Sequence, residues 1–334
     1  MTSPTVLALT MGEPAGVGGE ITLKAWLGRA AHALPPFLVL DDPQRLAALA
    51  QRLGLNVPLQ VVNTPEEAAD GFSHALPVLP QALIRAVEPG HPDPANTPAV
   101  LASIQRAVEL TQTGKTAAVV TNPIAKSVLQ AGGFAFPGHT EYLAHLAGLT
   151  DEPVMMLACA ALRVVPVTIH VSLRRAIETL TTEAIVHCGR VTAQALTRDF
   201  GITHPRIAVA GLNPHAGEDG AMGSEDRDIV APAVARLNAL GIAAFGPRPA
   251  DTLFHAQARA GYDAVLGMYH DQVLIPIKTL DFENGVNATL GLPLVRTSPD
   301  HGTAFDIAGR GLASEKSLVA ALKMAADMAE KRRG

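Results

Sequence analysis

Three histidines follow apolar, β-rich runs of the sequence. His170 ends the run 164–171, and His215 and His270 come shortly after the runs 207–211 and 263–268. Strands that run side by side in one direction end at the same edge of a sheet, so the three side chains can converge. Three imidazoles suit Zn²⁺, Co²⁺ or a related divalent ion and leave one position open for substrate. Chance placement is the alternative, because the chain has 12 histidines and this spacing matches no short metal motif.

A second group of polar residues lies in segment 276–309, among many Gly and Pro residues. It contains Lys278, Asn287 and Arg296. The planar fork of Arg pairs well with carboxylate or phosphate, and Lys supplies a point charge. We interpret these residues as the lining of a cleft for an anionic substrate, with solvated surface charges as the alternative.

Two further segments suggest contacts to anions. His139 and Thr140 precede an expected helix over 141–149 that Thr140 could cap, and a helix N-terminus favours phosphate or carboxylate. The glycine-containing run 10–20 follows an expected strand and could approach an anion in the same way. It is neither a Rossmann fingerprint nor a P-loop, and a tight turn explains it equally well.

The elements that must position these residues alternate along the chain. Apolar runs typical of buried strands alternate with amphipathic stretches of helical length, which predicts an α/β fold. The expected strands are 6–9, 37–40, 117–121, 164–171, 207–211 and 263–268, and the expected helices are 18–28, 43–53, 97–112, 181–199, 224–240 and 314–331. We expect two lobes that share one continuous fold, the first made of residues 1–122 plus 278–334 and the second of residues 123–277.

Composition excludes several classes of protein. Of 334 residues, 48% are hydrophobic and 17% charged, which rules out a disordered chain. The net charge of −5 argues against a nucleic-acid-binding surface. Cys159 and Cys188 cannot make a disulfide framework or a zinc knuckle, so we expect a reducing, cytoplasmic setting. We expect neither a signal peptide nor a membrane span.

Several runs, taken together, resemble one enzyme family over nearly the whole chain. The chain is similar to the 4-hydroxythreonine-4-phosphate dehydrogenase (PdxA) family. The runs that carry this resemblance are GEPAGVG at 12–18, GHTE at 138–141, GLNPHAGE at 211–218, GPRPADTLF at 246–254, MYHDQ at 268–272, TLGLP at 289–293 and RTSPDHGTA at 296–304.

The resemblance implies a fold and a site. The fold would be like that of isocitrate and isopropylmalate dehydrogenases, with two α/β/α lobes around a central cleft. It implies a homodimer with dimer contacts in the second lobe and the active site at the subunit interface. One divalent metal, Zn, Co or Mg, would be held by His170, His215 and His270. Substrate would contact His139, Thr140, Lys278, Asn287 and Arg296.

The resemblance also implies a reaction. The 3-hydroxyl of 4-phosphooxy-L-threonine would be oxidised with NAD or NADP, and loss of CO₂ would leave 3-amino-2-oxopropyl phosphate, in the synthesis of pyridoxal 5'-phosphate (vitamin B6). Lys278, Asp251 and Asp271 are the candidates for catalytic roles, the two aspartates by orienting imidazoles or moving protons. A helix cap before Thr252 explains Asp251 equally well. The residues that contact the dinucleotide are not predicted, although 12–19 and 300–306 are candidate segments.

Three other functions remain open at this point. A dehydrogenase of D-erythronate or D-threonate 4-phosphate in sugar-acid catabolism would use the same metal and phosphate contacts. A metal-dependent hydrolase or lyase could use three histidines, and a phosphosugar-binding protein could retain the scaffold. We favour the pyridoxine enzyme, because the runs 276–282 and 213–218 resemble it.

Overall fold

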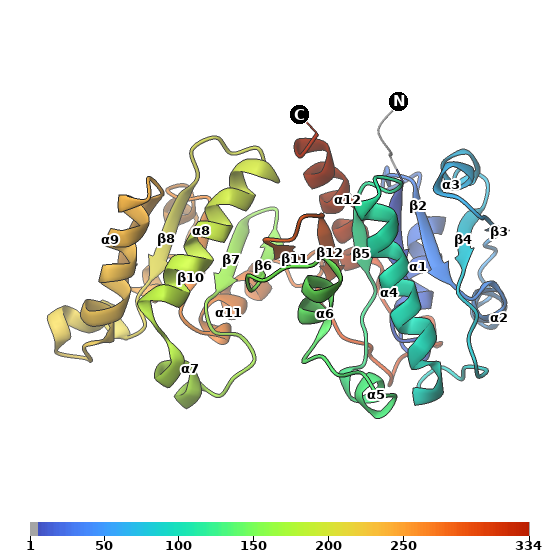
Figure 1. The fold of residues 1–334 in the computed structure, drawn as a ribbon, viewed down its shortest axis with the longest axis horizontal. Helices are drawn as coiled ribbons and strands as arrows, with labels where there is room; N and C mark the ends of the chain where they lie inside the picture. Colours follow the sequence, from blue (N-terminus) through green and yellow to red (C-terminus); the bar gives the residue numbers. More distant parts are fainter. Residues whose placement is uncertain (1–5, 334) are drawn as a thin grey trace. The chain divides into compact units, whose positions relative to one another are not determined.

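The computed structural model describes residues 6–333, which divide into two compact units (Figure 1). Residues up to 152 and from 292 onward form the first unit, and residues 153–291 form the second. The chain thus crosses between units later than the expected 122 and 277. The reason is packing: α6 (His139–Leu146) contributes Tyr142 and Leu143 to the core of the first unit, and β11 (Val286–Leu290) pairs with β6 (Val154–Cys159) of the second.

The described part of the first unit contains an all-parallel sheet in the order β3-β4-β2-β1-β5-β12. Its central strands are buried along their whole length, as expected for strands with helices on both faces. The strands are β1 (Leu7–Thr10), β2 (Phe37–Asp41), β3 (Leu59–Val61), β4 (Leu76–Pro80), β5 (Val119–Thr121) and β12 (Arg296–Pro299).

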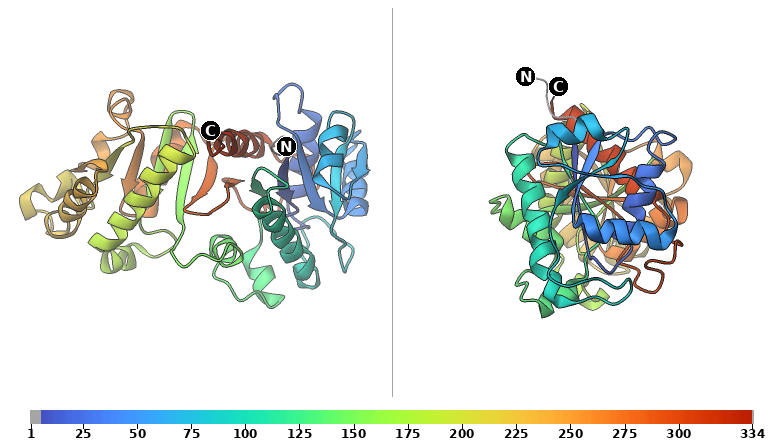
Figure 2. Two further views of the ribbon diagram at one scale, coloured as in Figure 1. Left: turned by 45° about the horizontal axis from the view of Figure 1, so that its top comes forward. Right: turned by 90° about the vertical axis from the view of Figure 1, so that its right-hand side faces the viewer.

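Helices cover this sheet on both sides. Ile104 and neighbouring apolar residues of α4 pack on one face, and α1 and α12 contact each other on the other (Figure 2). Asp42 caps α2, and its carboxylate accepts the N–H groups of Gln44 and Arg45. The helices of this unit are α1 (Gly18–Leu27), α2 (Pro43–Leu53), α3 (Pro65–Gly71), α4 (Thr97–Gln112), α5 (Lys126–Ala131), α6, α12 (Lys316–Lys331) and the 3-10 turn η1 (Pro94–Asn96).

The second unit has a mixed sheet in the order β11-β6-β7-β10-β8-β9. β6 is antiparallel to both of its neighbours, whereas β7, β10, β8 and β9 run parallel to one another. The remaining strands are β7 (Leu162–Pro166), β8 (Arg206–Ala210), β9 (Ala243–Arg248) and β10 (Ala264–Gly267). The expected strand over 164–171 is therefore wrong at its end, since β7 stops at Pro166.

Helices also cover the second sheet. Val164, Ala208 and Val265 share a core with α11 on one face of the sheet. Because side chains alternate along a strand, the residues next to them in sequence face the opposite side, where α8 packs. The helical segments are α7 (Leu173–Thr179), α8 (Thr182–Arg198), η2 (Pro214–Gly220), η3 (Asp226–Val230), α9 (Ala231–Ala239), η4 (Ala250–Thr252), α10 (Ala256–Arg259) and α11 (His270–Leu280). The predicted α/β class is confirmed.

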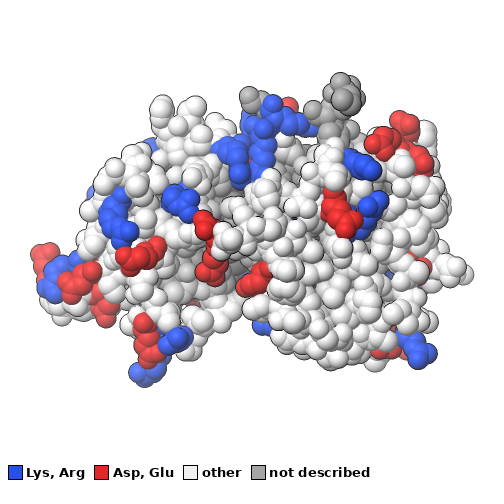
Figure 3. Space-filling model, in the orientation of Figure 1, with Lys and Arg blue, Asp and Glu red and all other residues white. Residues whose placement is uncertain are grey.

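Charged side chains of both signs occur on the surface of the protein. On the face drawn in Figure 3, acidic and basic side chains are interspersed over much of the surface, and Lys and Arg gather near the C-terminal end of α12. Within residues 6–333, no helix is both long enough and apolar enough to cross a membrane.

Candidate functional site

The three histidines follow neighbouring parallel strands, as the sequence predicts. β10 lies between β7 and β8, and His170, His270 and His215 come after the carboxyl ends of these strands. His170 does not end its strand, because the chain bends after Pro166. It nevertheless stays beside β10, since the N–H groups of residues 167 and 168 donate to the carbonyl oxygens of residues 267 and 268.

Two of the histidines lie close together. The ring centroids of His170 and His270 are 5.7 Å apart. His270 is the first residue of α11, and its Nδ1 lies 2.7 Å from Oδ1 of Asp271. An imidazole that donates from Nδ1 to a carboxylate keeps the lone pair of Nε2 for a metal ion. This geometry fits the orienting role expected for Asp271.

His215 lies in a left-handed turn. Its φ is 53°, and the following residues through Asp219 also have positive φ. The turn is anchored by Asp226, which is 1% exposed and accepts the N–H groups of Leu212 and Asn213 at 2.7 and 3.0 Å. The side-chain amide of Asn213 donates to the same carboxylate. Sequence analysis did not identify Asp226, because no short sequence pattern indicates that its carboxylate bonds to a loop 13 residues earlier in the chain.

Two side chains join the histidine-bearing segments to one another. Nε2 of Gln272 donates to the carbonyl oxygen of Gly211 at 2.7 Å, and its Oε1 accepts the N–H of Met268 at 2.7 Å. The hydroxyl of Thr168 donates to the carbonyl oxygen of Met268 at 2.8 Å. The ends of β7, β10 and β8 are therefore held in register by two residues that sequence reasoning did not single out.

Within the described part of the chain, the three histidines do not form one group. Among residues 6–333, no three or more His, Cys, Asp or Glu side chains form a group that could hold a metal ion. The chain supplies the pair His170 and His270, whose imidazoles are suitable donors, without His215 in the same group.

Asp251 is exposed on η4, a turn that packs against the segment of His215. The helix-cap interpretation of Asp251 is wrong. Pro249 occupies the cap position, and no side chain caps this turn.

A second polar site lies in the first unit. Arg296, at the start of β12, is 4% exposed and donates from Nη2 and Nε to the hydroxyl of Thr121 at 2.6 and 3.2 Å. Its Nη2 also lies 3.5 Å from Nδ1 of His139. Because a guanidinium can only donate, Nδ1 of His139 is the acceptor and Nε2 carries the proton. That Nε2 is buried and has no hydrogen-bond partner among the described residues.

Burial determines the charges of this pair. It lowers the pKa of Arg296 to about 10, so the guanidinium stays charged at neutral pH. Burial, and then the positive charge of Arg296, hold the pKa of His139 well below its ordinary value, so the imidazole is neutral. A fixed cation beside an unpaired N–H donor is an arrangement that suits an anionic ligand.

The remaining predicted substrate residues occupy separate positions. Thr140 is the second residue of α6 and does not cap it, because the helix begins at His139 after Gly138. Asn287, on β11, has a buried Oδ1 without a partner among the described residues. Lys278 lies in the last turn of α11, with Nζ 5.6 Å from the ring of Phe282. Both Asn287 and Lys278 belong to the second unit, whereas His139, Thr140 and Arg296 belong to the first.

Comparison with known proteins places the chain in a family. A family model described as pyridoxal phosphate biosynthetic protein PdxA matches residues 33–325. The chain belongs to the PdxA family.

Curated PdxA relatives match over almost their full length. The chain is 54% identical to a 4-hydroxythreonine-4-phosphate dehydrogenase of Xanthobacter autotrophicus, covering 99% of this chain and 95% of the relative. It is 54% identical to the protein of the same name from Caulobacter vibrioides, covering 98% of each. The crystal structure of 4-hydroxythreonine-4-phosphate dehydrogenase from Klebsiella pneumoniae has a TM-score of 0.89 and 40% identity, covering 98% of each chain.

Proposed function

We propose that this protein is a 4-hydroxythreonine-4-phosphate dehydrogenase. It oxidises 4-phosphooxy-L-threonine with NAD or NADP, and decarboxylation gives 3-amino-2-oxopropyl phosphate and CO₂, in the synthesis of pyridoxal 5'-phosphate. The observation that carries the proposal is the pairing of Arg296 with a neutral His139 in a chain of the PdxA family. The Nε2–H of His139 is buried and has no partner within residues 6–333. D-Erythronate 4-phosphate and D-threonate 4-phosphate are less favoured substrates. The reason is that the curated relatives described above are named 4-hydroxythreonine-4-phosphate dehydrogenase.

The substrate carries a phosphate and a carboxylate at neutral pH, and these anionic groups need fixed donors. We assign Arg296 and the Nε2–H of His139 to one anionic group, with Thr140 beside them at the start of α6. Asn287, whose buried Oδ1 has no partner in the described part of the chain, can accept from an amino or hydroxyl group of the substrate. Lys278 is the candidate for the other anionic group or for proton transfer at the reacting carbon.

His170, His215 and His270 are the proposed ligands of a divalent ion, which could be Zn, Co or Mg. A bound ion would lower the pKa of the substrate hydroxyl and stabilise the charge that develops on its oxygen. Asp271 would hold the tautomer of His270, and Asp251, on the turn beside the segment of His215, is the candidate for proton transfer.

A homodimer is part of this proposal. Within residues 6–333, His170 and His270 are close together and His215 is not grouped with them, so a second copy would complete the ligand set. Large apolar side chains of the second unit are exposed, which is typical of surfaces that a subunit interface covers. They include Leu173 and Ile177 of α7, Ile275 and Leu280 of α11, and Phe282.

The nicotinamide ring, when bound, would accept the hydride from the substrate carbon that becomes oxidised.

A cytoplasmic location is also part of the proposal. Its support is that the chain has two cysteines, Cys159 and Cys188, which are too few for the disulfide framework of a secreted protein.

The function is tested by following NAD or NADP reduction at 340 nm with metal-stripped protein. Zn²⁺, Co²⁺ or Mg²⁺ is added back, and 4-phosphooxy-L-threonine is compared with D-erythronate and D-threonate 4-phosphate. Metal-dependent reduction with the first substrate alone is the expected result. Reduction with a sugar acid alone would replace the proposed substrate, and no reduction by a folded, metal-binding protein would contradict a dehydrogenase.

A further inference from the structure

The amino group of 4-phosphooxy-L-threonine distinguishes it from D-erythronate 4-phosphate and D-threonate 4-phosphate, which carry a hydroxyl in its place. Asn287 cannot make this distinction, because an amide oxygen accepts from an amino group and from a hydroxyl alike. A carboxylate can, because the attraction between opposite charges adds to its hydrogen bond with an ammonium group. The contact that selects the amino substrate should therefore be a carboxylate that the protein does not occupy itself.

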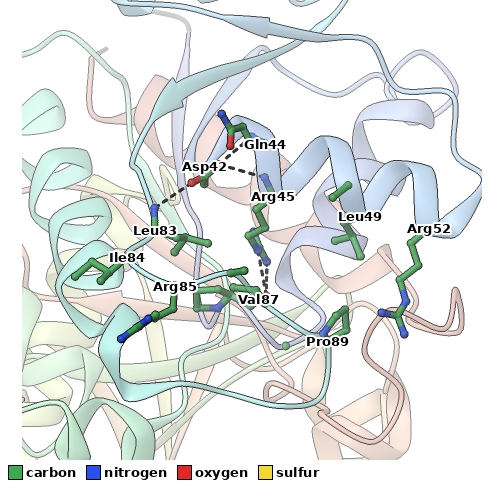
Figure 4. Close-up of a pocket in the computed structure, with 14 residues that line it drawn as sticks. Asp42, Gln44, Arg45, Leu49, Arg52, Leu83, Ile84, Arg85, Val87 and Pro89 are labelled. Atoms are coloured by element: carbon green, nitrogen blue, oxygen red, sulfur yellow. Dashed lines mark hydrogen bonds between the residues drawn. The ribbon is translucent and has the colours of Figure 1, made fainter.

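A cavity of about 480 Å³ in the first unit, between α2 and the loop after β4, offers no such group among its described lining residues (Figure 4). Asp42 is the acidic residue of the lining, and its two oxygens accept backbone N–H groups at 2.8 and 3.0 Å. Three arginines line the same cavity, and their charges repel an ammonium group: Arg45, Arg52 and Arg85. The partner of the amino group therefore lies elsewhere in the chain.

The turn η2, which carries His215, has two carboxylates that the protein does not occupy. Glu218 and Asp219 are exposed, and neither carboxylate makes a hydrogen bond or ion pair within residues 6–333. By contrast, the acidic residues of the following segment 225–228 all bond to other side chains. Glu218 and Asp219 are therefore the carboxylates beside His215 that are available to a ligand.

Glu218 shares one face of this turn with His215. Side chains three residues apart lie one above the other on a 3-10 helix, and residues 215–219 form such a turn with positive φ throughout. The residues between them face inward, since Ala216 lies against the backbone after β8 and a Cβ at Gly217 would lie 3.2 Å from Oδ2 of Asp226. His215 and Glu218 are both exposed, on the outer side of the turn.

The backbone conformation of Glu218 is unfavourable for its residue type. Its φ is 43°, in the left-handed region that Gly, Asn, Asp and His adopt more readily than Glu. A glycine at this position would stabilise the turn more. A strained backbone that carries a side chain without a partner in the described protein points to a role in binding.

We propose that Glu218 is a specificity-determining residue that binds the amino group of the substrate. The inference rests on the dehydrogenase function proposed above, in which His215 helps to hold the ion at the substrate hydroxyl. The amino group is on the carbon next to the one that bears this hydroxyl, so a carboxylate on the same face as His215 is placed to receive it. Asp219, one residue further along the turn, points to a different side.

The test compares Glu218→Gln with the wild type, using purified full-length protein loaded with Co²⁺. Gln keeps the shape of the side chain and removes its charge. Affinity is measured as Kd by isothermal titration calorimetry and as KM or Ki in the NAD assay. We expect the affinity for 4-phosphooxy-L-threonine to fall about tenfold to a hundredfold, and the affinity for the two hydroxy acids to change less than about threefold.

The matched control is Asp219→Asn, which removes the neighbouring carboxylate from a position where Asn is well tolerated. It should leave the affinities for all three ligands unchanged. Asp251→Asn, on the adjacent turn η4, tests the other carboxylate near His215. A selective loss of the amino substrate in Asp251→Asn and not in Glu218→Gln would overturn the proposal.

Three further results would overturn it. One is an unchanged affinity of Glu218→Gln for the amino substrate, and another is an equal loss for the amino and hydroxy compounds. The third is a large loss of Co²⁺ affinity, which would make Glu218 a ligand of the ion. If neither hydroxy acid binds the wild type, pH decides: wild-type affinity for the amino substrate should fall as its ammonium group deprotonates, and an equal fall in Glu218→Gln would contradict the contact.

Failure of this contact and failure of the enzyme are separable. If the wild type oxidises 4-phosphooxy-L-threonine and Glu218→Gln does not discriminate against it, the contact is wrong and the function stands. If calorimetry shows the selective loss of the amino compound but the wild type never oxidises it, the function is wrong and the contact stands.

Discussion

Nη2 of Arg296 lies 3.5 Å from Nδ1 of His139, although the two residues are 157 positions apart in the sequence. The contact determines which nitrogen of His139 carries its proton and leaves a buried N–H that no described residue pairs with. Buried donors in native proteins are nearly always paired, so we expect a ligand or a water molecule to complete this one. The arrangement explains why we assign an anionic group of the substrate to this pair.

Thr121→Val tests the support of Arg296. The hydroxyl of Thr121 accepts two bonds from the guanidinium, and Val keeps the shape without the acceptor. Since a hydrogen bond to a charged group contributes about 1.5–3 kcal/mol, we expect KM for 4-phosphooxy-L-threonine to rise about tenfold to a hundredfold. The KM for NAD should not change. Thr113→Val, at the exposed C-terminal end of α4, is the control, and equal loss of substrate and NAD binding would contradict the assignment.

The neutral state of His139 predicts a pH dependence of stability. Its pKa is depressed in the folded protein, so the unfolded chain binds more protons below its ordinary pKa of about 6.5. This residue therefore favours unfolding as pH falls below about 6.5, by up to about 1.4 kcal/mol per pH unit, until the folded pKa is reached. Above about pH 6.5 the penalty is absent.

Urea unfolding at pH 7.5 and 5.5 measures this effect. The free energy of unfolding should fall more on acidification for the wild type than for His139→Gln, which cannot titrate. His204→Gln, on a loop of the second unit, controls for removal of a histidine elsewhere. Equal pH dependence of the wild type and His139→Gln would show that the imidazole is not held neutral.

Gln272→Ala tests the link between the segments of His215 and His270. The amide of Gln272 joins Gly211 to Met268, and loss of such outer contacts commonly lowers metal affinity about 10–100-fold. We expect a loss of Co²⁺ affinity in that range by calorimetric titration, with unchanged circular dichroism. Gln194→Ala, exposed on α8, should bind Co²⁺ like the wild type. Undiminished affinity in Gln272→Ala would remove this residue from the support of the site.

Asp226→Asn tests the anchor of the left-handed turn. The carboxylate accepts two backbone N–H groups and one side-chain amide, and an amide in its place would direct N–H toward other donors. Leaving buried donors unpaired costs about 1–3 kcal/mol each, so we expect the free energy of unfolding to fall by at least about 1 kcal/mol in urea. Asp228→Asn, at an exposed pair with Arg227, should change it little. A stability equal to that of the wild type would show that the turn does not depend on Asp226.

Local sequence patterns determined much of this molecule. Buried apolar runs such as Phe37–Asp41 and the amphipathic stretch of α4 identify strands and helices, because side-chain periodicity and burial act over a few residues. The positions of His170, His215 and His270 after three such runs, and the motifs of the PdxA family, were also readable without a structure.

Tertiary structure alone decided which of these residues meet. The order β7-β10-β8 brings the three histidine-bearing segments to adjacent strand ends, and Gln272 and Asp226 hold them through partners that no local pattern identifies. The crossing points between the units depend likewise on where α6 and β11 pack. These contacts join residues far apart in the chain, so their energies depend on strand order and packing and not on any short stretch of sequence.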